Sequence, residues 1–424
     1  MDLLDLALLP ARPFKATIRE SLPPRDVTSI GEEAPPAAVG ATREGVRRVS
    51  RALEALYRTG LYPAIQLCVR RRGRVVVQRA IGHARGNGPR DGADAERVPV
   101  TPETPFVIYS ASKAITAMLV HKLDERRLLH LDDRVCDYLP EFASHGKEWM
   151  TIRHVLAHRA GIPNLPPDAM DLDLLQDPAH VVGILCEARP LSRPGRRLAY
   201  HAVSGGFVLG ELVRRVTGQD VRAVLRKELC EPLGFRWMNY GVASQDVERV
   251  GRDAVTGLPL LPPMAALFRR ALGVPFARAV ELAGDPRFLT GVVPSANVVA
   301  NADELCAFYQ CLLDGGDLGG VQVFDPRTVR HATSEQTYLE LDLTLGIPLR
   351  YGLGFMLGGT SLSLFGPDTP YAFGHLGFTN IISWADPARR LAVALVTSGK
   401  PFVSLDSLRL WSLLVEIGRA FPPE

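Results

Sequence analysis

The sequence predicts an α/β fold in which helices flank an antiparallel β-sheet and an all-helical lobe is inserted into that body. Three observations support this prediction. Strand-like segments are concentrated at residues 63–82 and again at 372–397. Between them, residues 151–290 carry helical periodicity and few strand patterns. The length of 424 residues, with 46% hydrophobic content, is enough for one large or two medium domains with a core.

The ends of the chain differ in character. Residues 1–40 are rich in proline, and we expect them to form an N-terminal tail. Residues 41–58 carry apolar positions at helical spacing, and Gly60 follows as a stop signal. A helical pattern over 405–421 closes the chain. We therefore expect a helix near each end of the α/β body.

Two hairpins are predicted where paired strand-like segments are separated by a short polar turn. The first joins 63–70 to 74–82 through Arg71-Arg72-Gly73. The second joins 380–385 to 391–397 across Asp386-Pro387-Ala388-Arg389-Arg390. Because a tight turn joins antiparallel strands, the two hairpins predict an antiparallel sheet.

The middle third is predicted to be helical, and a cleft between such a lobe and the body is a common place for a ligand. The expected helices cover 152–158, 179–188, 205–217, 221–229 and 260–282. The predicted division is a tail at 1–40, an α/β body at 41–150 and 291–424, and a helical lobe at 151–290.

Ser110 and Lys113 form a Ser-x-x-Lys pair where an apolar, strand-like run turns into a helical pattern. Residues i and i+3 of a helix share a face, with Cβ atoms about 5–6 Å apart. A buried lysine can lose its proton well below the ordinary pKa of about 10.4, and its amine can then take the proton of the serine hydroxyl. The alternative is that Ser110 or Ser112 only caps the helix and that Lys113 is solvated.

A second Ser-x-x-Lys pair, Ser144 and Lys147, lies between Pro140 and Met150 in a stretch with loop character. We therefore favour Ser110 as the nucleophile. The chain has no G-x-S-x-G sequence, which argues against an α/β-hydrolase elbow.

Composition excludes several classes of function. The net charge is +3 and the basic residues are scattered, which does not indicate nucleic-acid binding. Six dispersed cysteines without C-x-x-C spacing predict reduced thiols and no metal site. No apolar run reaches 18 residues, and Asp2 and Asp5 stand where an export signal carries positive charge. We expect a cytoplasmic protein without a membrane span and leave the oligomeric state, monomer or homodimer, open.

Further motifs follow the Ser110 pair in a fixed order. They are Leu129–Asp133 leading to Tyr138–Phe142, Thr151–Ile162, Tyr200-His201-Ala202, Gly210–Gly218 and Gly374-His375-Leu376-Gly377. Together they resemble the serine hydrolases of the β-lactamase and penicillin-binding-protein superfamily, in particular its class C-like esterases (family VIII carboxylesterases) and D-peptidases. The resemblance runs from about residue 45 to the C-terminus.

This resemblance implies a β-lactamase-like α/β body and acyl transfer through a covalent intermediate. Ser110 would attack the substrate carbonyl, and Lys113 and Tyr200 would share the role of general base. Tyr200 would then protonate the leaving alcohol. The backbone N–H groups of Ser110 and Phe378 would bind the oxyanion, and Gly377 would let the strand approach the substrate.

Two departures from the superfamily pattern indicate the substrate. Ala202 stands where β-lactamases and D,D-peptidases carry an asparagine, and His375 stands where they carry a lysine. Such a site lacks an amide-binding side chain and a permanent cation for a substrate carboxylate, contacts whose loss commonly costs about 1.5–3 kcal/mol. We therefore predict hydrolysis of uncharged, short-chain carboxylic esters. Acyl transfer, weak β-lactamase or D,D-peptidase activity, and a non-catalytic binding or assembly role remain alternatives.

Other candidate residues have weaker support. Tyr200 and His375 can also be read as structural residues at an interface and at a strand end. His154 and His158 are spaced like metal ligands but lack an intervening glutamate, so we interpret them as packing residues and predict no metal or cofactor. The remaining candidates for lining the pocket are Tyr109, Trp237, Phe378, Trp384 and Ser295-Ala296-Asn297.

Overall fold

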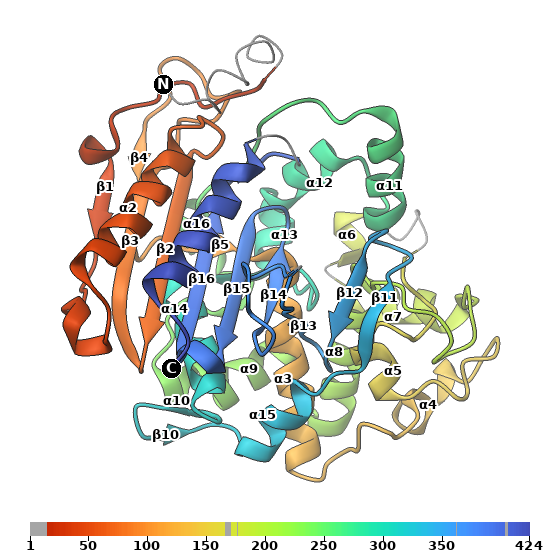
Figure 1. The fold of residues 1–424 in the computed structure, drawn as a ribbon. Helices are drawn as coiled ribbons and strands as arrows, with labels where there is room; N and C mark the ends of the chain where they lie inside the picture. The colour runs from red at the N-terminus through yellow and green to blue at the C-terminus, as the bar shows by residue number, and fades with distance from the viewer. Residues whose placement is uncertain (1–14, 166–170, 176, 362, 403–405) are drawn as a thin grey trace.

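The computed structural model describes residues 15–165, 171–175, 177–361, 363–402 and 406–424. Its centre is a ten-stranded antiparallel sheet (Figure 1). In spatial order the strands are β1 (Thr28–Ile30), β3 (Arg74–Arg85), β2 (Ala64–Arg71), β16 (Leu391–Thr397), β15 (Ile381–Asp386), β14 (Phe373–Gly377), β13 (Met356–Leu357), β12 (Pro348–Tyr351) and β11 (Thr337–Leu341), and β4 (Val98–Pro99) pairs with β3.

Both predicted hairpins are confirmed. β2 and β3 pair antiparallel around a turn in which Arg72 and Gly73 are left-handed, with φ of 51° and 77°. β15 and β16 pair antiparallel from Ile382 opposite Leu395 to Asp386 opposite Leu391. β2 also pairs with β16 over its length, so strands from the two ends of the chain meet in the middle of the sheet.

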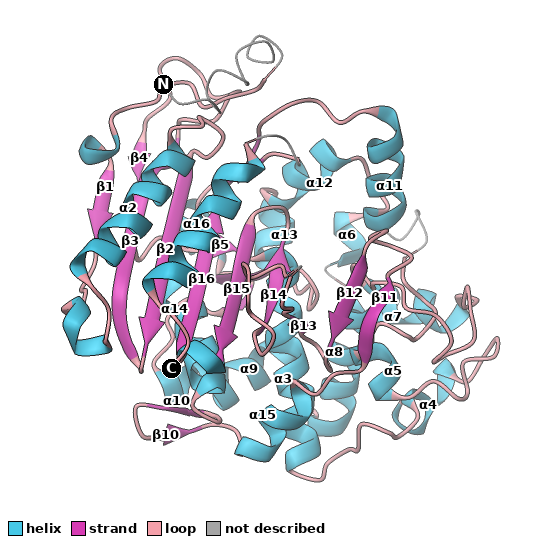
Figure 2. Cartoon of the chain, in the orientation of Figure 1, coloured by secondary structure: helices cyan, strands magenta, loops and turns pink. Residues whose placement is uncertain are grey.

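Helices cover both faces of the sheet (Figure 2). On β16, Val393 and Leu395 belong to the apolar cluster under α2 and α16, whereas Ala392 and Ala394 belong to the cluster that contains α14. This alternation is the period of two that a strand buried on both faces requires. The helices at 41–58 and 405–421 are confirmed. The three covering helices are α2 (Arg43–Tyr57), α14 (Ala302–Leu313) and α16 (Ser407–Ala420).

The regular elements described within residues 151–290 are mostly helices, and one expected helix is wrong. The pattern over 260–282 forms two helices, because Gly273 ends the first in a left-handed conformation (φ 77°) and Pro275 precedes the second. No helix in the described part of the chain has the length and apolar character needed to cross a bilayer. The helices are α5 (Ile152–Leu156), α6 (Leu172–Leu175), α7 (Pro178–Glu187), α8 (Ser204–Thr217), α9 (Val221–Leu225), α10 (Glu231–Leu233), α11 (Pro262–Leu272), α12 (Phe276–Ala283) and α13 (Pro286–Thr290).

Three small sheets lie outside the main sheet in the described part of the chain. β5, β8 and β6 form a small antiparallel sheet, β7 pairs parallel with β17, and β9 pairs with β10. These strands are β5 (Phe106–Val107), β6 (Asn239–Tyr240), β7 (Ala254–Val255), β8 (Val298–Ala300), β9 (Asp317–Leu318), β10 (Val321–Gln322) and β17 (Gly399–Lys400). Two further helices are α4 (Val135–Tyr138) and α15 (Pro326–Ala332).

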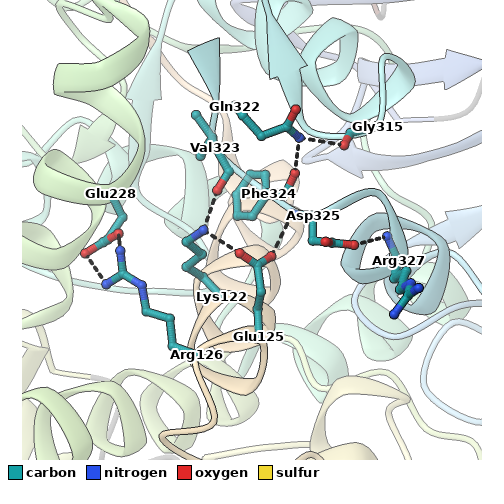
Figure 3. A network of polar contacts seen from close by, with 10 residues as sticks. All are labelled: Lys122, Glu125, Arg126, Glu228, Gly315, Gln322, Val323, Phe324, Asp325 and Arg327. Carbon is teal, nitrogen blue, oxygen red and sulfur yellow. Dashed lines mark hydrogen bonds and ion pairs between the residues drawn. The ribbon is translucent and has the colours of Figure 1, made fainter.

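α3 (Ser112–Glu125) packs against α8 of the lobe and against β14 of the sheet. Its C-terminal end is held by the polar network of Figure 3. The ammonium of Lys122 donates to the carbonyl oxygen of Val323 at 2.6 Å. Arg126 donates two hydrogen bonds to the carboxylate of Glu228, at 2.5 and 2.7 Å. One end of the helix is thus tied to segments on both sides of it, and its other end carries the Ser-x-x-Lys pair.

Gly354, which follows β12, lies directly against α3. Gly354 has φ of 98°, and a Cβ at this position would lie 2.1 Å from the Cβ of Ala117. Only glycine satisfies both the conformation and the space.

Replacing Gly354 with alanine should therefore destabilise the fold strongly. We expect Gly354→Ala to lower the free energy of unfolding by roughly 2–5 kcal/mol, from overpacking added to the left-handed backbone. The matched control is Gly346→Ala, where φ is also positive (72°) but a Cβ would meet nothing within 4 Å. Urea denaturation of both variants measures the difference, and equal losses would contradict the close contact with α3.

Candidate active site

Ser110 lies in a 3₁₀ turn, Tyr109–Ala111, between β5 and α3. The helix expected to begin at Ser110 begins two residues later, and Ser110 is half-buried at its N-terminal end. Tyr109 has φ of 50°, a left-handed conformation that is unusual for a bulky residue and costs about 1–3 kcal/mol. Backbone strain of this kind is concentrated at functional sites in proteins.

β8 holds this turn from the other side. The backbone N–H of Ile108 donates to the carbonyl oxygen of Val298 at 2.9 Å. The N–H of Val298 in turn donates to the hydroxyl of Ser112 at 3.0 Å. The residues on either side of the 3₁₀ turn are therefore both fixed to a single strand.

Lys113 brings three separate segments together. Its Nζ lies 3.1 Å from Oγ of Ser110, 2.8 Å from the carbonyl oxygen of Ala202 and 3.1 Å from the carbonyl oxygen of Ser295. The side chain is buried, and no carboxylate contacts Nζ among the residues that the structure describes. The solvated alternative for Lys113 is therefore wrong.

Burial lowers the pKa of Lys113 to about 7. The neutral amine has two N–H bonds and one lone pair. The carbonyls of Ala202 and Ser295 can only accept hydrogen bonds, so they take the two N–H groups. The lone pair is then left for the third neighbour, the hydroxyl of Ser110. This arrangement suits an amine that accepts the serine proton.

Tyr200 lies beside the pair, and its ring centroid is 4.8 Å from Nζ of Lys113. Burial raises the pKa of Tyr200, and the nearby hydroxyl of Ser110 opposes this rise. The side chain is therefore a phenol at neutral pH rather than a phenolate. A phenol can donate its proton and accept another, so Tyr200 can relay a proton without being a base itself.

Asp342 fixes the backbone at Tyr200 and was not found from the sequence. One carboxylate oxygen of this buried residue accepts three N–H groups, from Tyr200 at 3.1 Å, Thr344 at 2.9 Å and Leu345 at 3.0 Å. The other oxygen accepts the hydroxyl of Tyr351 at 3.2 Å. Asp342 alternates with Leu341 and Leu343 in the sequence, a pattern that predicts an exposed aspartate, whereas in the structure the aspartate is buried and the two leucines are exposed.

Histidines surround the tyrosine. The ring of His158 lies 4.7 Å from that of Tyr200, and its Nδ1 accepts the backbone N–H of His201 at 3.2 Å. His154 closes a capping box with Thr151 at the start of α5. Both residues make packing and hydrogen-bonding contacts, and no group of three or more potential metal ligands occurs in the described segments.

His375 is buried in β14, with its ring 6.2 Å from that of Tyr200. Its Nδ1 lies 2.7 Å from the carbonyl oxygen of Leu376. Because a carbonyl oxygen can only accept a hydrogen bond, Nδ1 carries the ring proton and Nε2 carries an unprotonated lone pair. Burial, helped by the charge of Lys113, lowers the pKa of His375 to about 3. This histidine is neutral at pH 7 and cannot replace a lysine as a cation.

β14 brings Gly377 and Phe378 against the 3₁₀ turn Tyr109–Ala111, which we call the nucleophile turn after the proposed role of Ser110. A Cβ on Gly377 would lie 2.5 Å from the carbonyl oxygen of Ile108, so only glycine allows this approach. The ring of Phe378 lies 5.4 Å from that of Tyr109 and 5.0 Å from that of Phe276. Phe378 therefore lies next to the turn of Ser110 and presents an apolar surface there.

The two tryptophan candidates lie elsewhere. Trp384 pairs with Gly374, one position away from His375, so it points to the opposite face of the sheet and is buried there against Phe365. The guanidinium groups of Arg236 and Arg249 lie over the ring of Trp237, at 5.0 and 5.2 Å from its centroid, and the backbone N–H of Trp237 donates to Glu304. No contact among the described residues joins either tryptophan to Ser110, Lys113 or Tyr200.

Ser295 contacts the site through its backbone carbonyl, which accepts a hydrogen bond from Lys113. Its hydroxyl donates to the carbonyl oxygen of Val203 at 2.9 Å and accepts the N–H of Gly206 at 2.9 Å. Asn297 instead holds the loop before β8, where its side chain bonds to Phe288 and to Val293. Of this predicted pocket-lining segment, Ser295 alone contacts Lys113.

The second Ser-x-x-Lys pair makes the same local contact. Nζ of Lys147 lies 3.2 Å from Oγ of Ser144, and the amine also bonds to the carbonyls of Cys186 and Ala188 at 2.7 and 2.6 Å. The hydroxyl of Ser144 itself donates to the carbonyl of Cys186. This pair ties a loop to the end of α7, and within the part of the chain that the structure describes no tyrosine is bonded to it.

Comparison with known proteins identifies the family. The family model described as Beta-lactamase matches residues 49–414. The chain is 32% identical over 313 residues to the Mycobacterium tuberculosis protein named Esterase/beta-lactamase LipL, a match that covers 70% of each chain. This protein therefore belongs to the beta-lactamase family.

Two crystal structures share its fold. One is a penicillin-binding protein homolog from Caulobacter crescentus, with 27% identity and a TM-score of 0.77 over 93% of this chain and 100% of that one. The other is a family VIII carboxylesterase, with 25% identity and a TM-score of 0.76 over 91% of this chain and 99% of that one. With these relatives, the protein is an enzyme of the serine hydrolase class.

Removing the carboxylate of Asp342 should loosen the segment that carries Tyr200. Asp342→Ala leaves three backbone donors and a phenol without their buried acceptor, so we expect a loss of about 2–4 kcal/mol in the free energy of unfolding. Asp342→Asn keeps one acceptor oxygen and should lose less. Urea denaturation of both variants measures the effect, and an alanine variant as stable as the wild type would show that these bonds contribute nothing.

Proposed function

We propose that this protein is a serine carboxylesterase that hydrolyses uncharged carboxylic esters through an acyl intermediate on Ser110. The observation that carries the proposal is the buried amine of Lys113, which lies 3.1 Å from Oγ of Ser110 and 4.8 Å from the centroid of the Tyr200 ring. The relative named Esterase/beta-lactamase and the family VIII carboxylesterase structure support the same chemistry.

In the first step, Oγ of Ser110 attacks the carbonyl carbon of the ester while the lone pair of Lys113 takes the hydroxyl proton. The negative charge that forms on the carbonyl oxygen is bound by the backbone N–H groups of Ser110 and Phe378. One such donor typically contributes about 10²–10³ in rate. The closeness of β14 to the nucleophile turn at Gly377 supports this pairing.

In the second step, the tetrahedral intermediate collapses and the bond to the leaving alcohol breaks. Tyr200 gives its phenolic proton to the alkoxide and regains one from Lys113, whose Nζ lies over its ring. We assign the base role to Lys113 alone, because burial raises the pKa of Tyr200 and lowers that of Lys113. In the last step water attacks the acyl group, and the same side chains transfer its proton to Oγ of Ser110. This releases the carboxylic acid and restores Ser110.

The surroundings of the site favour an uncharged substrate. Ala202 offers only its methyl group and a carbonyl that Lys113 already occupies. His375 is neutral, and beside Phe378 lie the rings of Phe276 and Phe268, at 5.0 and 6.3 Å. A carboxylate would lose its hydration on such a surface without gaining a counter-ion. We propose short acyl chains and a reducing, cytoplasmic location, the latter because all six cysteines are free.

Replacing the nucleophile tests the proposal directly. We expect Ser110→Ala to lower hydrolysis of p-nitrophenyl acetate, butyrate and octanoate at least about 10³-fold, because no covalent intermediate can form. Ser144→Ala is the matched control, since Ser144 has the same lysine contact, and it should stay within about twofold of the wild type.

The outcomes separate the alternatives. A wild type that cleaves no ester, or a Ser110→Ala variant that keeps its activity, overturns the proposal and favours a non-catalytic role. Faster turnover of nitrocefin or of a D-alanyl-D-alanine peptide than of any ester would mean β-lactamase or D,D-peptidase activity. A large rate increase on adding alcohols or amines, with ester products, would mean acyl transfer.

The pH dependence follows from Lys113. Its folded-state pKa is lowered to about 7, and the reactive form is the neutral amine. We therefore expect kcat/KM for p-nitrophenyl butyrate to rise about tenfold per pH unit at acidic pH and to level off above pH 7–8. Initial rates between pH 5 and 9, followed at a wavelength where both forms of nitrophenol absorb equally, give the profile. A midpoint above pH 9 would contradict a neutral amine as base.

A further inference from the structure

A buried ion pair lies behind the nucleophile turn, outside the groups that the proposed chemistry uses. Nζ of Lys400 is 3.3 Å from Oδ1 of Asp253, and their side chains are 0% and 8% exposed. The hydroxyl of Tyr109 donates to Oδ2 of the same carboxylate. Nζ of Lys400 also lies 4.8 Å from the centroid of the Tyr109 ring. Tyr109, Asp253 and Lys400 thus form one closed cluster.

This cluster is built from segments far apart in the sequence. Asp253 directly precedes β7, Lys400 ends β17, and these two strands pair in parallel. The amine of Lys400 also donates to the carbonyl oxygen of Thr397 at 2.6 Å, at the end of β16. The charges that hold Tyr109 are therefore anchored at the end of β16, a central strand of the main sheet, and are not carried by α3.

Tyr109 links the cluster to both proposed oxyanion donors. It directly precedes Ser110, and its own φ of 50° is the left-handed outlier of the turn. Its ring packs against Phe378 at 5.4 Å. A residue in such a strained conformation persists only when its surroundings hold it there. The hydroxyl bond to Asp253 and the cation over the ring are the contacts able to do so.

Stability of the fold alone does not explain this ion pair. Replacing a buried ion pair by apolar residues of similar volume is often neutral or stabilising, because burial removes the hydration of both charges. Consistent with such burial, the pKa of Asp253 is raised and that of Lys400 is lowered. A charged pair that is costly to bury, beside the strained residue before the nucleophile, points to a role in the site.

We propose that Asp253 and Lys400 are positioning residues for the hydrolytic reaction. Acting through the hydroxyl and ring of Tyr109, they hold the left-handed turn that sets Oγ of Ser110 and the backbone N–H groups of Ser110 and Phe378. The inference rests on the proposed esterase function, since it concerns the geometry of that same nucleophile.

Two variants test it. Tyr109→Phe deletes one oxygen and keeps the ring. The double variant Asp253→Leu with Lys400→Met removes both charges together, so that neither is left buried alone. We expect each to lower kcat for p-nitrophenyl butyrate about 10- to 100-fold, with KM within about threefold, because a misplaced nucleophile affects the reaction more than binding. The melting temperature of the double variant should equal or exceed that of the wild type.

The matched control is Tyr138→Phe. The hydroxyl of Tyr138, the last residue of α4, also donates to a carboxylate, that of Asp133, at 2.6 Å. This variant should keep kcat within about twofold. The inference is overturned if Tyr109→Phe and the double variant both keep kcat within twofold, or if kcat falls only in proportion to a fall in melting temperature. Ser110→Ala, measured in the same assay, separates the two claims: if that variant stays active, the esterase proposal fails and this inference fails with it.

Discussion

The site depends on the burial of one amine. Lys113 is surrounded by the carbonyls of Ala202 and Ser295 and the hydroxyl of Ser110. Its pKa falls to about 7 because burial removes its hydration and, among the described residues, no carboxylate contacts the amine. Much of the architecture serves this contact. α3 supplies the lysine, the segment before α8 supplies Ala202, and the segment before β8 supplies Ser295. Shifting any of these three segments would leave an unpaired polar group in the interior.

The same desolvation accounts for the character of the neighbouring groups. Burial lowers the pKa of His375 and His201 to about 3, and it raises the pKa of Tyr200. At neutral pH each of these side chains is uncharged. These neutral groups and apolar rings are the reason for proposing a neutral ester, and not a carboxylate, as the substrate.

Local patterns in the sequence were enough for local structure. Both hairpins and the two terminal helices were predicted, because turn residues and hydrophobic periodicity act over a few positions. Where a local signal was overlooked, the prediction failed, as at Gly273, which divides the helix expected over 260–282. Trp384 was misplaced because its face of the sheet follows from the register with β14, which periodicity alone does not reveal.

By itself, the sequence determined the fold class, the family resemblance and the Ser110–Lys113 pair, since spacing alone brings i and i+3 together. Spacing could not distinguish this pair from Ser144 and Lys147, whose atoms are just as close, at 3.2 Å. The tertiary structure gives the two pairs different surroundings. It places Tyr200 beside one lysine, brings the carboxylate of Asp342 to the backbone of Tyr200, and sets the Asp253–Lys400 pair behind Tyr109. These contacts join residues 87 to 291 positions apart, and chain folding, not local preference, creates them.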